Sequence, residues 1–343
     1  MPVSPRRATL ATVAASAGVS VATVSKVLNG RSDVAPATRS LVQSLLRQHE
    51  YVAPSPRRGE AVGLDTVEVQ FDSDINAYST EIIQGVVTAG GEVGVGVVVS
   101  VMKDGDRTAR WARDLLSAGR RALIAVTSEL SAGQLAALSR AHLPLVVIDP
   151  LNLPRARVTS VGSTNFAGGL AATQHLLSLG HRRIAYVGGP ATAACNQARL
   201  HGYRAAMETE GAAVLPGYTR SGRFRYQDGL EHGAAVLALP EPPTAIFVGC
   251  DETALGVMEA ARARGLRIPE DLSIVGFDDT QIARMASPPL TTVRQPLREM
   301  GGVALRTALR LAAGEKIDSH HVELATELVV RGSTADVTCA EHA

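Results

Sequence analysis

The sequence is poor in cysteine and in long apolar segments, and each shortage excludes a class of protein. Three cysteines, an odd number at wide spacing, argue against a disulfide framework and favour a reduced, cytoplasmic chain. The N-terminus carries arginines with no apolar segment behind them, so no secretory signal is expected. The most apolar stretch, residues 85–102, contains Glu92 and five glycines, and it predicts a helix end, a turn and a buried strand rather than a membrane span.

Catalytic motifs are missing as well. None of the three lysines follows a glycine, which excludes a phosphate-binding P-loop, and no HExxH, GxSxG or GxGxxG motif occurs. His320 and His321 are adjacent, as in some metal sites, but no third ligand lies near them in the sequence. We therefore expect no enzyme, no cofactor and no metal site.

Charge is nearly balanced over the 343 residues, with a net of +1, but it is unevenly distributed. Residues 1–61 hold eight arginines and lysines against three acids, whereas the rest of the chain is mildly acidic. A basic segment before an acidic body favours phosphate binding by the first segment. An excess of this size also arises by chance, so the charge alone does not decide the matter.

Three short helical patterns open the chain. Residues 10–17 form the first and end at Gly18, where a glycine tolerates the positive φ of a tight turn. Ser20 can cap a second helix over residues 21–29, and Pro36 suits the first turn of a third. A helix, a glycine turn and a second helix predict a helix-turn-helix. The side chains expected to face its core are Val13, Ala14, Ala17, Val24, Leu28, Leu41, Leu45 and Leu46.

Beyond this region the pattern changes. Residues 52–63 contain two prolines, two glycines and two arginines, which indicates a linker. From residue 64 short apolar segments alternate with helical patterns, and this predicts parallel sheets in two α/β subdomains. The expected strands are 67–71, 95–101, 122–126, 143–148, 183–187, 245–248 and 273–277, and the clearest helices are 168–179, 202–210, 229–239, 253–265 and 297–313.

The second helix has small outward-facing side chains at its start. If its N-terminus enters a major groove, Val21 and Ala22 can contact thymine methyl groups, and Lys26 can reach guanine acceptors one turn later. A small three-helix bundle with a solvated polar face would show the same pattern. Hydroxyl and amide groups suited to phosphate oxygens are those of Ser20, Thr23, Ser25 and Asn29.

Two stretches, TLATVAASAGVSVATVSKVLNG at residues 9–30 and VAPATRSLVQSLLRQHEYV at 34–52, resemble the head of the lactose-repressor (LacI/GalR) family. The resemblance continues over residues 63–334 through GHRRIAYVGGP, RLHGYRAAM, DETALGVMEAAR, IPEDLSIVGFDD and PPLTTVRQP. It implies an all-α helix-turn-helix head and a periplasmic-binding-protein-like sensor of two parallel-sheet subdomains, in a homodimer that binds a near-palindromic DNA operator and a small-molecule effector. The implied DNA contacts are base reading by Val21, Ala22 and Lys26 and phosphate contacts by Thr9, Ser20, Thr23, Ser25, Asn29, Thr38 and Tyr51.

The resemblance also implies domain boundaries. We expect a DNA-binding head over 1–52, a hinge or linker over 53–63, an effector-binding and dimerisation domain over 64–334, and a tail over 335–343. Within the effector-binding domain we expect one subdomain from 64–162 with 292–320 and the other from 163–291 with 321–334.

Three positions depart from the family pattern. Thr12 stands where an acid is usual and Ala35 where a helix cap is usual, and either change weakens the head by roughly 1 kcal/mol, the typical worth of a cap. Family members commonly insert a hinge leucine into the minor groove, whereas here Glu60 occupies that place. Arg57 and Arg58 become the candidates for the minor groove, which attracts cations.

Effectors of such folds bind at the carboxyl ends of strands, between the subdomains. The resemblance implies that Arg199, expected to begin a helix, holds the effector. Asp278 directly follows a strand, where a carboxylate can accept from two hydroxyls, so the two side chains together can grip a vicinal diol. Further effector candidates are Asn165 and Phe224, which match family positions, and Asp74, Asn76 and Asp149.

Each of these residues also has an ordinary structural interpretation. Asp278 can cap the following helix, Arg199 can form a surface ion pair, and Phe224 can pack in a core. Asp149 can belong to a simple turn with the proline that follows. Cys250 stands where many relatives have asparagine, so one ligand contact is expected to be altered.

The leading hypothesis is a DNA-binding repressor of sugar-utilisation genes, released by a sugar and similar to actinobacterial members of the family. A purine- or nucleoside-responsive regulator of the same family is the alternative. A periplasmic sugar-binding protein shares the sensor fold, but residues 1–52 contradict that assignment. A sugar-modifying enzyme has no motif to support it.

Overall fold

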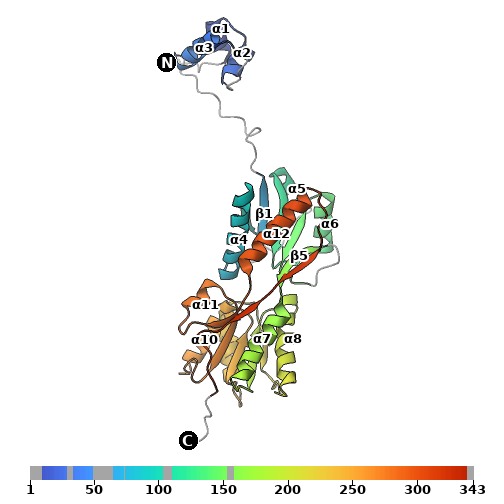
Figure 1. The fold of residues 1–343 in the computed structure, drawn as a ribbon, viewed down its shortest axis with the longest axis vertical. Helices are drawn as coiled ribbons and strands as arrows, with labels where there is room; N and C mark the ends of the chain where they lie inside the picture. The colour runs from blue at the N-terminus through green and yellow to red at the C-terminus, as the bar shows by residue number, and fades with distance from the viewer. Residues whose placement is uncertain are drawn as a thin grey trace, which may run out of the picture. The chain divides into compact units, whose positions relative to one another are not determined.

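The structure, a computed structural model, describes residues 10–28, 34–48, 65–72, 74–102, 110–152 and 158–337. The chain divides into two compact units, Met1–Gly63 and Leu64–Ala343, which we call the head and the sensor. The described part of the head consists of helices α1 (Leu10–Ala17), α2 (Val21–Leu28) and α3 (Pro36–Gln48) (Figure 1).

Local hydrogen bonds define the turn between α1 and α2. Gly18 has a φ of +63°, and the N–H of Val19 donates to the carbonyl of Ala14 at 3.1 Å, which closes α1 in a Schellman-type end. Ser20 caps α2, because its Oγ accepts from the N–H of Thr23 at 3.2 Å. The predicted helix-turn-helix is confirmed.

The head has a small core made of aliphatic side chains. Val13 and Ala14 face it as predicted, but the prediction for Leu41 is wrong, because this side chain is 48% exposed and Val42 is buried in its place. The periodicity of α3 allowed either neighbour, and packing against α1 and α2 decides between them. The prediction for Leu28 concerns a side chain outside the described residues. The buried members are Val13, Ala14, Val24, Val27 and Val42.

The sensor contains two six-stranded sheets. The first has the order β11-β5-β4-β3-β1-β2 and is parallel throughout. The second has the order β12-β10-β9-β8-β6-β7 and is parallel except for β12. The strands are β1 (Thr66–Phe71), β2 (Gly96–Val101), β3 (Arg120–Val126), β4 (Leu145–Ile148), β5 (Thr159–Ser163), β6 (Ile184–Gly188), β7 (Thr219–Ser221), β8 (Ala245–Val248), β9 (Ser273–Asp278), β10 (Thr291–Arg294), β11 (His321–Leu324) and β12 (Glu327–Val329).

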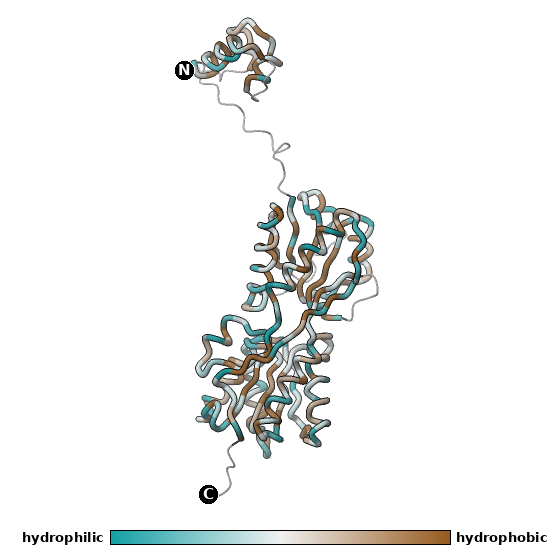
Figure 2. Tube along the Cα trace, in the orientation of Figure 1, coloured by the Kyte–Doolittle hydropathy of each residue, from teal (hydrophilic) through white to brown (hydrophobic). Residues whose placement is uncertain are grey.

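Helices cover the faces of these sheets, as parallel strands require. Figure 2 shows hydrophobic residues concentrated along the strands beneath them. None of the helices in the described residues is long and apolar enough to span a membrane. The sensor helices are α4 (Ala77–Val93), α5 (Trp111–Ser117), α6 (Ala132–Arg140), α7 (Asn165–Ser178), α8 (Ala194–Thr209), α9 (Tyr226–Leu237), α10 (Asp251–Arg262), α11 (Gln281–Met285) and α12 (Leu297–Ala312).

The described chain crosses from one sheet to the other three times. It passes to the second sheet after β5, returns to the first sheet after β10, and leaves the first sheet again after β11. We expected the chain to pass from one subdomain to the other at about residues 292 and 321. The structure places these passages a few residues later, because β10 still pairs with β9 and β11 still pairs with β5. We call these three connections the crossovers.

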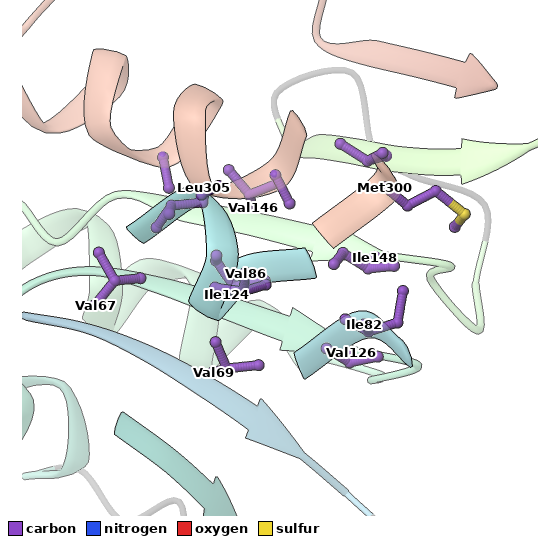
Figure 3. Packing of buried hydrophobic residues seen from close by; sticks show 14 of the residues in the cluster. Val67, Val69, Ile82, Val86, Ile124, Val126, Val146, Ile148, Met300 and Leu305 are labelled. Carbon is purple, nitrogen blue, oxygen red and sulfur yellow. The ribbon is translucent and has the colours of Figure 1, made fainter. Parts of the chain in front are cut away.

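The core of the first sheet lies under α4 and α12. Ile82 and Val86 of α4 and Met300 and Leu305 of α12 pack on valines and isoleucines of the strands (Figure 3). The expected buried strand at 95–101 is wrong in its burial. It is β2, an edge strand with one neighbour, and none of its residues is buried, while Val99 and Val101 are exposed.

Glycines let two pairs of helices approach closely beside the second sheet. A Cβ atom added to Gly169 of α7 would lie 2.3 Å from the backbone oxygen of Arg199 of α8, and Gly202 of α8 is equally close to the backbone of α7. Gly229 and Gly256 repeat the arrangement between α9 and α10. In both pairs, backbone contacts set the distance between the helices.

The seven predicted strands all form, with bounds within two residues of the expected ones. Five strands were not predicted, because they are short or rich in threonine, serine and charged residues: β5, β7, β10, β11 and β12. The sequence analysis also began α8 at residue 202, whereas the helix begins at Ala194. Arg199 therefore lies inside this helix and does not begin it.

Candidate functional site

The head exposes the predicted base-reading side chains together. Val21, Ala22 and Lys26 are exposed on α2, whereas Val24 and Val27 of the same helix are buried. A short helix with small side chains at its N-terminus and a lysine one turn later can enter a major groove without steric conflict.

Two of the predicted phosphate contacts, Ser20 and Thr23, lie at the N-terminus of the same helix. The hydroxyls of Ser20 and Thr23 lie 2.9 Å apart in the cap of α2, and Ser25 and Thr38 are half-buried. The positive end of a helix dipole favours a phosphate at this place. The remaining DNA-contact candidates, Thr9, Asn29, Tyr51, Arg57 and Arg58, lie outside the described residues.

The sensor holds a cavity of about 400 Å³ at the carboxyl ends of the strands of both sheets. Asn165 lies just outside the cavity and contacts Arg199 from behind. The structure therefore brings together residues that the sequence analysis selected from both halves of the sensor. The predicted effector residues that line the cavity are Asp74, Asn76, Asp149, Arg199, Phe224 and Asp278.

Arg199 is buried at the centre of this site and is not part of a surface ion pair. Its Nε donates to Oδ1 of Asn165 at 2.7 Å, and its Nη1 donates to the carbonyl of Gly249 at 2.6 Å. Its guanidinium lies 3.8 Å from the ring centre of Phe277, and Nη1 lies 3.9 Å from Oδ1 of Asp278. The cation is thus held in place, with the carboxylate close enough for one ligand to contact both.

Asp278 is the last residue of β9, and its carboxylate does not cap α11. Its Oδ1 accepts from Nε2 of Gln295 at 2.7 Å. Burial raises the pKa of Asp278 well above its usual range, and Arg199 opposes that shift. A hydroxyl-bearing ligand would give this buried carboxylate further hydrogen-bond donors in addition to Gln295.

The opposite wall of the cavity comes from the first sheet. Asp149 follows β4 and accepts from the hydroxyl of Tyr78 at 2.7 Å. Burial raises its pKa as well, while Arg199 opposes the shift. Asn76 caps α4, with Oδ1 accepting from the N–H of Ser79 at 3.0 Å, so this candidate has a structural role as well as a place in the wall.

Backbone strain marks the same cavity. Thr127, Asp149, Phe224 and Asp278 have φ values of 46°, 44°, 62° and 114°, in the region that favours glycine, and all four line it. Such conformations cost of order 1–3 kcal/mol each and cluster at ligand sites. Phe224 is half-buried here and is not a core residue.

Three residues of the site were not predicted from the sequence. Tyr78 holds Asp149, Gln295 holds Asp278, and Cys195 lines the cavity with its pKa raised by burial to about 11. Tyr78 could have been predicted, because it lies near the start of a helix that follows a predicted strand. No sequence pattern pointed to Gln295 or Cys195. Cys250, the asparagine replacement, caps α10 through its sulfur, which accepts from the N–H of Thr253.

The adjacent histidines have ordinary hydrogen-bond partners. Nδ1 of His320 lies 3.1 Å from the hydroxyl of Thr159, and Nδ1 of His321 lies 3.0 Å from the hydroxyl of Ser160. Among the described residues, no cluster of three metal-ligating side chains is present.

Two family descriptions match the chain. Residues 9–54 match "Bacterial regulatory proteins, lacI family", and residues 173–334 match "Periplasmic binding protein-like domain". The transcriptional regulator DegA of Bacillus subtilis is 33% identical, covering 96% of this chain and 98% of its own length. The transcriptional regulator CelR of Thermobifida fusca is 32% identical, with the same two coverages.

Solved structures match most of the chain. The complex of CelR with cellobiose superimposes with a TM-score of 0.72 at 32% identity and covers 95% of this chain and all of the other. A lac repressor dimer bound to operator and the anti-inducer ONPF gives a TM-score of 0.74 at 27% identity, with coverages of 96% and 100%.

Proposed function

The chain belongs to the lacI family of bacterial regulatory proteins and is a DNA-binding transcriptional regulator, and we propose that a sugar bound in its cavity releases it from its operator. The resemblance drawn from residues 9–52 and 63–334 is thereby confirmed. The relatives are transcriptional regulators, and this chain is assigned to that class rather than to an enzyme class. A protein that binds operator DNA in a bacterium acts in the cytoplasm.

The observation that carries the sugar proposal is the donor and acceptor set of the cavity. Arg199 offers a buried guanidinium beside the carboxylate of Asp278, and Asp149 offers a second carboxylate from the other sheet. Phe224 presents an aromatic ring at the same cavity, 5.6 Å from the guanidinium of Arg199. Charged acceptors and donors suit vicinal hydroxyls, and an aromatic face suits the apolar side of a pyranose ring.

A dimer fits the surface of the first subdomain. Val87 and Val93 of α4 and Val99 and Val101 of β2 are exposed, and α4 and β2 pack against each other. Exposed apolar side chains on neighbouring elements favour burial against a second copy. A twofold pair of heads would bind a near-palindromic operator.

The test of the sugar proposal is operator release. The operator is first selected from random DNA with the full chain. Its dissociation constant is then measured with cellobiose, lactose, ribose and glucose, and with adenosine and cytidine for the nucleoside alternative. We expect one sugar to raise it 5–150-fold, the usual range of such coupling. Release by a nucleoside alone, or by none of the compounds, would contradict the proposal.

Two substitutions locate the effector in the cavity. Arg199→Ala and Asp278→Asn remove the charged partners, so both should abolish sugar release while operator binding without sugar stays within about threefold. Arg204→Ala, an exposed arginine on the same helix, is the matched control and should respond like the wild type. Retained release in both cavity variants would place the effector elsewhere.

The proposed reading of the operator sequence depends on Lys26. Lys26→Ala should cost about 1–3 kcal/mol at one operator position and relax the base preference there. An equal loss on every DNA sequence would make Lys26 a phosphate contact instead.

The contribution of Arg57 and Arg58 to binding in the minor groove stays a prediction. The double alanine variant should lose operator affinity, and its affinity should depend less steeply on salt concentration, whereas Glu60→Ala should bind the operator equally well or more tightly.

A further inference from the structure

From the wall of the cavity inward, five side chains form a closed ring of polar contacts. Oγ of Ser163 donates to Oε1 of Gln295 at 2.5 Å, and Nε2 of Gln295 donates to Oδ1 of Asp278 at 2.7 Å. Nη1 of Arg199 lies 3.9 Å from that same Oδ1, and its Nε donates to Oδ1 of Asn165 at 2.7 Å. Nδ2 of Asn165 donates to the carbonyl of Ser163 at 3.0 Å and closes the ring.

The ring joins the effector residues to two crossovers. Ser163 ends β5 in the first sheet, and Asn165 begins α7, so both belong to the first crossover. Gln295 directly follows β10 and lies in the second crossover. All five side chains are buried, so the loss of one contact is costly to the groups that remain.

We propose that Gln295 is the positioning residue that orients Asp278 toward the effector and links it to Ser163, so that effector contacts are transmitted to the crossovers. This inference rests on the proposed function. An amide is suited to the task because it accepts from the hydroxyl on one side and donates to the carboxylate on the other. Since Oδ1 of Asp278 faces both Gln295 and Arg199, a ligand that engages this carboxylate changes the contact that holds the second crossover.

Buried polar networks are sensitive to single losses because the remaining groups have no alternative partners. Replacing Gln295 by methionine preserves the length of the side chain and removes both hydrogen bonds. Ser163→Ala removes one of the same bonds from the other end. If the two residues act as one unit, the double variant should behave like the methionine variant alone, whereas independent residues would give additive effects.

The first experiment needs no effector. Amide hydrogen exchange is measured on the full-length variants over residues 163–170 and 276–282. We expect about tenfold faster exchange in Gln295→Met, no further increase in the double variant, and no change in Gln281→Met, an exposed glutamine on α11 that serves as the control. Unchanged exchange in Gln295→Met, or additive effects with Ser163→Ala, would overturn the proposal.

A pH profile of Gln295→Glu separates positioning from packing. A protonated glutamic acid can still accept from Ser163 and donate to Asp278, but an ionised one faces Asp278 with a second negative charge. Exchange rates in these segments are corrected for their intrinsic pH dependence and compared between the variant and the wild type. The two proteins should have equal rates at acid pH, and the rates of the variant should rise severalfold above those of the wild type as the new carboxyl ionises. A difference from wild type that is constant with pH would leave only a packing role and would overturn the proposal.

The second experiment measures coupling. Operator affinity is determined for the wild type and Gln295→Met with the compounds of the release test, beginning with cellobiose. We expect the wild-type coupling factor to fall to within threefold of unity in the variant, and full coupling in the variant would overturn the inference. If no sugar releases the wild type, the proposed function fails, while the exchange experiments still decide whether Gln295 positions Asp278.

Discussion

The head and the sensor solve the same packing problem on different scales. The described head buries five apolar side chains, none larger than valine, and no polar ones. The sensor buries tyrosines, phenylalanines and isoleucines together with charged groups such as Asp251, Arg199 and Asp278. A small core contributes little stability, so the head depends on few contacts, whereas the sensor has enough core to keep ionisable groups in its interior.

The two regions also differ in where their candidate binding residues lie. In the head, the predicted base-reading residues Val21, Ala22 and Lys26 are exposed on α2 and can be exchanged with little cost to folding. In the sensor, the candidate effector residues are buried and take part in its hydrogen bonds, so a change in ligand chemistry is also a change in stability. Four predictions test this contrast, from the largest expected effect to the smallest.

The largest contrast is expected in the response to pH. Burial raises the pKa of Asp251 to about 7, and Asp149 and Asp278 shift in the same direction, whereas the described head has no acidic residue. At these three carboxyls the folded sensor therefore binds more protons than the unfolded chain between about pH 4 and pH 7. Their contribution to the free energy of unfolding should fall as pH rises through that window, by up to about 1.4 kcal/mol per pH unit for each group, whereas His175 and His181, whose pKa values burial lowers, contribute in the opposite direction.

Urea unfolding of the full chain at pH 5 and pH 8 measures this slope. Asp251→Asn should flatten it, because the replacement has no proton to lose. The matched control is Asp318→Asn, whose side chain is 98% exposed, and it should keep the wild-type slope. A slope unaffected by Asp251→Asn would show that this buried carboxyl does not titrate in that window.

The next effect comes from the backbone contacts of the sensor. Gly169→Ala places a methyl group 2.3 Å from the backbone oxygen of Arg199, and backbone cannot move aside as a flexible side chain can. We expect a loss of about 3 kcal/mol in the unfolding free energy of the sensor. Gly91→Ala on α4 has open space around it and should be neutral or stabilising by up to about 1 kcal/mol. Equal effects of the two substitutions would refute the steric argument.

A smaller loss is expected from the core of the head. Val42→Ala removes two buried methyl groups and should cost about 2 kcal/mol, seen as weaker operator binding and earlier unfolding of the head. Leu41→Ala, on the same helix and largely exposed, should change stability by less than about 0.5 kcal/mol. Circular dichroism and operator titration of both variants provide the comparison, and a greater loss in Leu41→Ala would contradict the core described here.

The smallest effect concerns the turn of the head. Gly18 has a φ of +63° but nothing within 4 Å of an added Cβ, so Gly18→Ala carries only a conformational cost of about 1–2 kcal/mol. Gly18→Asn should recover part of this loss, because asparagine tolerates the left-handed region. Thermal unfolding ranks the three proteins, and an alanine variant as stable as the wild type would remove the reason for glycine at this turn.

Local patterns predicted much of this fold. The caps and turns around Gly18 and Ser20, and apolar strands such as β8, follow from features only a few residues long. β5 and β10 were missed because their threonines, serines and glycine become buried only through partners distant in the sequence. Arg199 was identified through the family resemblance and Asp278 through its place directly after a strand, whereas the role proposed for Gln295 depends on three segments that meet only in the folded chain.

The paired glycines between α7 and α8, and between α9 and α10, have an evolutionary consequence. Because main-chain atoms set these distances, the framework around the cavity does not depend on which side chains stand at the strand ends. Substitutions at positions such as Phe224 or Cys250 can therefore accumulate without repositioning the helices. A fold built in this way can acquire new ligand specificities by gradual change at its strand ends, and the same positions are the natural choice for a designed biosensor.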